Sequence, residues 1–137
     1  MQYSFILKII MKTLLTLFVL LLSFSVTAND FNWKKITTSS SGNNYYVDLS
    51  SIKKIDNKAF YLRLNDYIEP SEFGTLSSIV YIEINCRTLS YRYLQDRYYV
   101  FPMGKGELKS VINEKSEWHG SQKGSVAEFL NQYVCDY

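Results

Sequence analysis

The stretch Ser78–Cys86 reads SIVYIEINC, and it decides the fold expected for this 137-residue chain. Its apolar residues recur at every second position, which is the pattern of a half-buried strand whose side chains point alternately to two faces. The core-side positions are Val80, Ile82, Ile84 and Cys86. A cysteine therefore ends the apolar face of a predicted strand.

Two other segments alternate in the same way, over Ala59–Tyr67 and Arg87–Val100. In the first, we expect the apolar residues on the core side and the tyrosines and arginine on the opposite side. The expected core-side residues are Phe60, Leu62 and Leu64. Shorter strands are expected at Trp33–Thr37 and Tyr45–Leu49. Connections of hairpin length favour an antiparallel meander of about five to six strands.

The C-terminal segment has a different period. Ser125 and Glu128 form a capping box, in which both side chains satisfy free amides at the start of a helix. Apolar residues then recur at helical spacing: Val126, Phe129, Leu130, Tyr133 and Val134. This stripe predicts an α+β fold in which the helix packs on the sheet face that carries Cys86. Cys135 lies at the end of the helix, so a Cys86–Cys135 disulfide would join the helix to the sheet.

Residues 1–28 have the composition of a secretory signal peptide. Its parts are Lys8 and Lys12, the apolar segment Leu14–Phe24, and the small residues Val26–Ala28. We expect cleavage before Asn29 and one domain over residues 29–137. An uncleaved membrane anchor is the alternative, but a span of about 20 residues would have to bury both lysines. The cleavage site offers no cysteine, so we do not expect a lipoprotein.

Composition excludes several kinds of site. The chain has 15 basic and 13 acidic residues, and without the two lysines of the leader the remainder is neutral. A neutral surface argues against nucleic acid and anionic lipid. Two cysteines in an exported chain indicate one disulfide, worth about 4 kcal/mol on the chain-entropy account. Two cysteines and one histidine do not make a zinc site, and we expect neither metal nor cofactor.

The tyrosine content suggests a protein-binding surface. Eleven of the 12 tyrosines follow residue 28, and many fall on the side of the strands opposite the expected core. Tyrosine and arginine are enriched where proteins bind proteins. The candidate face consists of Tyr61, Arg63, Tyr67, Tyr81, Tyr91 and Tyr93. The alternative is an ordinary solvated sheet surface, on which tyrosines pair across strands.

Two other features carry alternative functions. Ser41, Gly42 and Tyr45 fit the pattern S-G-x-x-Y, which resembles the inhibitory loop of periplasmic c-type lysozyme inhibitors. Turn-forming composition alone also produces this pattern. His119 is the single histidine, and an enzymatic function would depend on it. No nucleophile motif accompanies it, so we expect no enzyme.

The order of these features resembles the surface-adhesin protein E family of Gram-negative bacteria. The matching positions are Trp33, Tyr46–Asp48, Ser50–Ile52, Tyr67, Ser77–Ser78, Tyr81–Cys86, Trp118 and Cys135. The resemblance implies a compact antiparallel sheet on a helix, the same disulfide and no enzymatic activity. The namesake of the family is an outer-membrane lipoprotein that binds host extracellular-matrix proteins.

The function expected from this resemblance is that of an exported binding protein. Its partner would be a host matrix or envelope protein. A homodimer is a further alternative. The location would be the periplasm or the cell surface after cleavage. The alternative function is inhibition of a lysozyme-type cell-wall hydrolase in the periplasm. The sequence leaves the ligand, the oligomeric state and the choice between the two locations undetermined.

Overall fold

The computed structural model describes residues 2–21 and 30–137. The chain divides into two units, residues 1–30 and 31–137. The first contains helix α1 (Gln2–Leu21). In the described ranges, no helix has the length and hydropathy needed to cross a membrane. The predicted cleavage motif Val26–Ala28 and the end of the apolar segment lie outside these residues, so the signal peptide stays a prediction.

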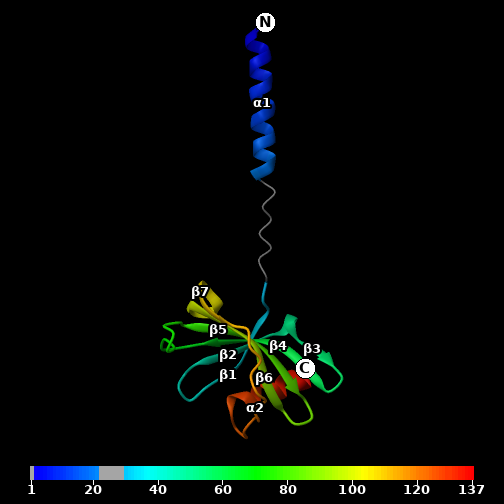
Figure 1. The fold of residues 1–137 in the computed structure, drawn as a ribbon, viewed down its shortest axis with the longest axis vertical. Helices are drawn as coiled ribbons and strands as arrows, with labels where there is room; N and C mark the ends of the chain where they lie inside the picture. Colours follow the sequence, from blue (N-terminus) through cyan, green and yellow to red (C-terminus); the bar gives the residue numbers. More distant parts are fainter. Residues whose placement is uncertain (1, 22–29) are drawn as a thin grey trace. The chain divides into compact units, whose positions relative to one another are not determined.

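Residues 31–137 form an antiparallel sheet with a helix against one face (Figure 1). The strands are β1 (Trp33–Thr38), β2 (Asn44–Asp48), β3 (Lys53–Ile55), β4 (Lys58–Asp66), β5 (Ser77–Asn85), β6 (Ser90–Phe101) and β7 (Lys105–Ile112). The helical elements are η1 (Leu49–Ser51), η2 (Pro102–Gly104) and α2 (Val126–Asp136). The strand order is β1-β2-β4-β5-β6-β7, and β3 pairs with β4 beside β2. The predicted α+β meander is confirmed.

Two strands were not expected from the sequence. β3 has three residues, all exposed, and β7 is exposed along nearly its whole length. Neither strand therefore shows the alternation of a half-buried strand.

The core lies between α2 and the middle of the sheet. Leu130 and Val134 of α2 are fully buried, and they face fully or almost fully buried side chains from the central strands. The sheet side of this cluster consists of Val47, Ala59, Tyr61, Val80, Ile82 and Ile84. The disulfide between Cys86 and Cys135 is present, with Cα atoms 5.7 Å apart. All of these residues lie within 31–137, so this unit contains its own core.

The capping box at the start of α2 is confirmed. The Ser125 hydroxyl oxygen accepts a hydrogen bond from the Glu128 amide at 3.2 Å. The Glu128 carboxylate in turn accepts one from the Gly124 amide at 2.6 Å. Both bonds satisfy amides that have no partner within the helix. The helix start is therefore fixed by local sequence.

The apolar stripe of α2 is wider than the surface that covers it. The sequence predicted that Phe129 would pack on the sheet with the other apolar residues, but its side chain is 57% exposed. Tyr133 is half-buried at the border of the core. The sheet covers only the flank of α2 that carries Leu130 and Val134. The prediction for Phe129 is therefore wrong.

Both edges of the sheet interrupt regular strand pairing. β1 carries the exposed Lys34 and Lys35, and its register with β2 shifts between Lys35 and Thr37. β7 carries the exposed Lys105 and Lys109, and its register with β6 shifts twice. Lysines and bulges on an edge strand oppose pairing with another chain.

The unequal burial along α2 predicts unequal costs of substitution. Leu130→Ala should lower the free energy of unfolding by about 3 kcal/mol, because it removes a fully buried side chain and leaves a cavity. Phe129→Ala, on the neighbouring exposed position, should change it by less than about 1 kcal/mol. Urea unfolding of the oxidised domain measures both values. Equal losses in the two variants would contradict this packing.

Candidate binding surfaces

The two faces of the sheet differ in what covers them. The helix side packs against α2, as described above. The opposite face, called the open face below, is formed by residues of β4, β5 and β6. Its residues are Phe60, Leu62, Tyr81, Glu83, Arg92 and Arg97. All of these except the buried Glu83 are half-buried, so this part of the face is accessible to solvent, whereas Leu64 and Ile79 on the same side are buried.

The predicted tyrosine face is not a single surface. In the register of β4 with β5, Tyr61 lies opposite the core residue Ile82, and Leu62 lies opposite Tyr81. Five of the six candidate residues therefore lie on the helix side of the sheet. The strand registers place Tyr61, Arg63, Tyr91 and Tyr93 there. Tyr67 follows β4, and its hydroxyl contacts the Ser78 hydroxyl on the same side at 2.8 Å. Tyr81 is the one candidate on the open face. The assignment of Phe60, Leu62 and Leu64 to the helix side was wrong, although Leu64 is fully buried on the opposite side.

The reason for this inversion is visible at Tyr61. Its side chain is fully buried beneath α2, and its hydroxyl donates a hydrogen bond to the buried Asn131 amide oxygen at 3.3 Å. A buried tyrosine is tolerated where its hydroxyl finds a partner. Burial raises the pKa of Tyr61 well above its usual value, although Arg63 opposes this effect. Tyr61 therefore belongs to the core and not to a binding surface.

Arg63 joins the other helix-side candidates in an aromatic cluster. Its guanidinium, in a side chain 8% exposed, lies 5.4 Å from the centre of the Tyr93 ring. Tyr91 packs against Tyr93 with ring centres 5.7 Å apart. Burial, followed by the neighbouring Tyr93, raises the pKa of Tyr91 to about 12. The Tyr93 ring attracts the buried cation by a cation–π contact, although the Nε atom of Arg63 has no hydrogen-bond partner among the described residues.

His119 was missed as a member of this cluster. Its ring lies 5.6 Å from that of Tyr91 and 5.5 Å from that of Tyr93. Its backbone also pairs with Tyr91, with amide-to-carbonyl distances of 2.7 and 2.9 Å. This position explains the histidine through packing. The enzymatic alternative gains no support from it.

The predicted inhibitory loop forms the turn between β1 and β2. Ser41 is exposed and Gly42 lies at a positive φ of 90°, with its amide donating to the Ser39 carbonyl at 2.9 Å. Tyr45, however, packs against the core as a half-buried residue of β2. The side-chain oxygen of Asn43, the residue after Gly42, accepts a hydrogen bond from the Ile68 backbone amide at 3.0 Å. The tyrosine of the motif therefore packs within the domain and does not project from the loop.

A hollow opens in the open face between β3, β4 and β6. Leu62 and Tyr81 form its apolar part, and Lys53 and Arg97 bring positive charge to it. Gln95 and Asn113 also line it, and the Gln95 amide donates to the Asn113 carbonyl oxygen at 2.6 Å. Sequence reasoning missed this hollow because its residues come from separate strands and follow no motif.

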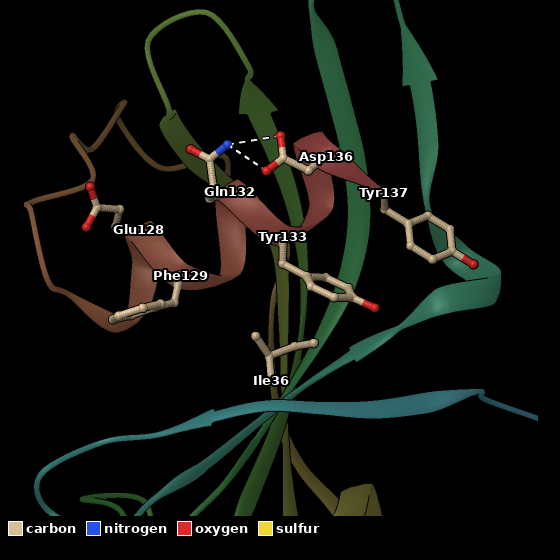
Figure 2. Close-up of a pocket in the computed structure, with 7 residues that line it drawn as sticks. All are labelled: Ile36, Glu128, Phe129, Gln132, Tyr133, Asp136 and Tyr137. Atoms are coloured by element: carbon tan, nitrogen blue, oxygen red, sulfur yellow. Dashed lines mark hydrogen bonds between the residues drawn. The ribbon is translucent and has the colours of Figure 1, made fainter.

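A second concave site lies between α2 and the edge strand β1. Figure 2 shows Tyr133 directed from α2 toward Ile36 on β1, with Phe129 and Tyr137 to either side of it. Phe129 and Tyr137 are 57% and 61% exposed. The charged side chains that line this groove are both acidic, Glu128 and Asp136. The signal in the sequence was the width of the apolar stripe, which exceeds what one sheet face can cover.

These features define a small disulfide-linked α+β domain with concave surfaces on both sides of the sheet. The family model of surface-adhesin protein E matches residues 33–136. The chain therefore belongs to the surface-adhesin protein E family, as the resemblance indicated. No curated protein matches the sequence.

Solved structures of protein E from Haemophilus influenzae have the same fold. One crystal form is 15% identical, with a TM-score of 0.60 over 80% of this chain and 91% of that chain. Protein E from a non-typeable strain is also 15% identical, with a TM-score of 0.55 over 80% of this chain and 79% of that chain. At this identity the likeness concerns the fold.

An ion-pair network on the open face makes stability depend on pH. The Glu83 carboxylate accepts from Lys58 Nζ at 2.7 Å and from Arg92 Nε at 2.6 Å. Burial alone would raise the pKa of Glu83, but these bonds outweigh it and hold the pKa below its usual value. Its stabilising effect is present above the unfolded-state pKa of about 4.3 and is lost as pH falls through the folded-state pKa. Glu83→Gln should therefore cost most stability near pH 7 and progressively less below about pH 4.

Asp96 provides the control with the opposite sign. Burial raises the pKa of Asp96, although a hydrogen bond from Tyr98 opposes the increase. Ionisation of this carboxyl therefore costs stability as pH rises through the interval between the two pKa values. Relative to the unsubstituted protein, Asp96→Asn should improve with rising pH, and Glu83→Gln should worsen. Urea unfolding between pH 3 and 7 measures both trends, and parallel trends would contradict these assignments.

Proposed function

We propose that this chain is an exported, non-enzymatic binding protein that contacts a host matrix or envelope protein through the groove between α2 and β1. The single observation that carries the site is the exposed aromatic flank of α2. Phe129, Tyr133 and Tyr137 follow one another at intervals of four residues, so they lie along one side of the helix. Amphipathic helices normally bury such a stripe, and exposed aromatic patches mark interaction sites.

The chemistry of the groove favours one kind of partner segment. Its floor is apolar, and Ile36 and Tyr133 leave space between strand and helix. The two acidic side chains at its margin, Glu128 and Asp136, favour basic neighbours in the partner. A protein segment that inserts an apolar side chain flanked by lysine or arginine satisfies both features. Family membership supports a binding role, since the family is that of a surface adhesin.

Export is part of the same proposal. The leader over residues 1–28 would be removed, and the oxidised domain would act in the periplasm or at the cell surface. The Cys86–Cys135 bond supports this, because disulfides persist in oxidising compartments. Labelling of intact cells with a non-permeant reagent distinguishes the two locations.

The groove predicts a selective loss of partner binding. Immobilised extracellular-matrix proteins should capture the oxidised 31–137 domain, and Phe129→Ser/Tyr137→Ser should weaken the capture at least tenfold by removing the aromatic contacts. Ile55→Ser is the matched control, because Ile55 is 60% exposed on β3 and outside the groove. Binding is measured by surface plasmon resonance.

Three outcomes would count against the proposal. In the first, the domain binds no matrix or envelope protein. In the second, the Ile55→Ser control loses as much binding as the groove variant. In the third, the groove variant changes only the self-association of the domain. Inhibition of lysozyme by the domain would instead favour the hydrolase-inhibitor alternative. In that case Ser41→Ala should reduce inhibition while the groove variant should not.

A further inference from the structure

The hollow in the open face is lined by Arg97, a half-buried side chain with one unpartnered N–H. The Nε atom of Arg97 is inaccessible to solvent and makes no hydrogen bond within the part of the chain that the structure describes. Lys53, exposed on β3, lines the same hollow. A buried donor without a partner is costly, and such groups often mark a site that a ligand completes.

The nearest acidic group of the hollow is already occupied. Asp48 is 3% exposed, and one of its carboxylate oxygens accepts three hydrogen bonds within the domain. The donors are the Asn32 amide at 2.9 Å, the Ser50 amide at 3.1 Å and the Ser50 hydroxyl at 2.6 Å. Among the described residues, no ion pair joins Asp48 to Lys53 or Arg97. Asp48 is therefore held away from solvent, and the exposed charged side chain that lines the hollow, Lys53, is a cation.

The walls of the hollow combine an aromatic ring with amides. Tyr81 lies opposite Leu62 on β4 and packs against the Phe60 ring, with ring centres 6.3 Å apart. On its other side it pairs with Gln95 of β6. The hydrogen bond from Gln95 to Asn113 leaves the Gln95 carbonyl oxygen and an Asn113 N–H available. An apolar platform, planar amides and two cations thus meet in one place.

We propose that this hollow binds an acidic polysaccharide. The apolar face of a sugar ring would pack on Tyr81, and its hydroxyl groups would bond to Gln95 and Asn113. Carboxylate or sulfate groups of the polymer would pair with Lys53 and with the guanidinium of Arg97, which both line the hollow, because charge-assisted hydrogen bonds favour an anion there. The amides and the aromatic platform favour a sugar over an acidic peptide. The site is separate from the groove of the proposed function.

The test uses defined oligosaccharides and the oxidised 31–137 domain. The probes are a hyaluronan hexasaccharide for the carboxylate, a heparin hexasaccharide for the sulfate, a neutral chitin hexasaccharide and a decamer of glutamate. Titration calorimetry at low and at physiological salt should show binding of one or both acidic sugars that weakens with salt. The neutral sugar and the acidic peptide should bind at least tenfold more weakly. A preference for hyaluronan or for heparin identifies the anionic group.

Variants locate the binding in the hollow. Lys53→Gln should weaken binding of the acidic sugar at least fivefold without unfolding, because Lys53 is exposed. Tyr81→Leu should weaken it as well, and circular dichroism checks that this variant is folded. Lys123→Gln is the matched control, since Lys123 is exposed in the loop before α2. The proposal is overturned if neither acidic sugar binds, if the glutamate decamer binds as tightly, or if the control loses as much as Lys53→Gln.

Discussion

The rest of the structure depends on the hydrophobic cluster in which α2 packs on one face of the central strands. Leu130 and Val134 are buried against a strip in which Val80, Ile82 and Ile84 alternate with polar residues. This contact decides which face of the sheet is core, and the register of β4 and β6 on β5 then assigns every other side chain to one face or the other. The disulfide from Cys86 to Cys135 holds the same two elements together at the end of the strip. Side chains along a strand alternate between the two faces of the sheet. Once β5 is placed, the pairing register therefore fixes which residues of each neighbouring strand face the core.

Sequence patterns predicted this central contact and failed further from it. The alternation of β5, the capping box at Ser125 and the two cysteines each had one physical interpretation, and all three are confirmed. In β4 the set Phe60, Leu62 and Leu64 is apolar and the alternate set carries Tyr61 and Arg63, so alternation alone indicated that the apolar set would face the helix. The inward orientation of Tyr61 depends on Asn131, a partner 70 residues away that satisfies the tyrosine hydroxyl. β7 was missed because an exposed edge strand has no apolar face to display.

Amino-acid composition did not predict the candidate surfaces, for a related reason. The domain after the leader has no net charge, yet on the open face the acidic side chains are buried and a basic side chain is exposed. On the open face Asp48 and Glu83 are each 3% exposed and hydrogen-bonded within the domain, while Lys53 remains exposed to solvent. A net charge counts buried and accessible groups alike, so it does not report the potential that a ligand meets. The groove was hidden in a similar way, because a helical stripe gives its apolar residues without showing how many of them the sheet can cover.

The lysines and bulges at the two edges of the sheet determine how such domains behave when they are crowded. Many copies at high local density would meet edge to edge, and a regular edge would let them join into a continuous sheet. Lys34 and Lys35 on one edge, and Lys105 and Lys109 on the other, oppose this joining. The molecule can therefore be abundant without polymerising through its backbone. Other molecules would then bind to the two faces of the sheet. There the side chains, and not the main-chain amides, determine what is bound.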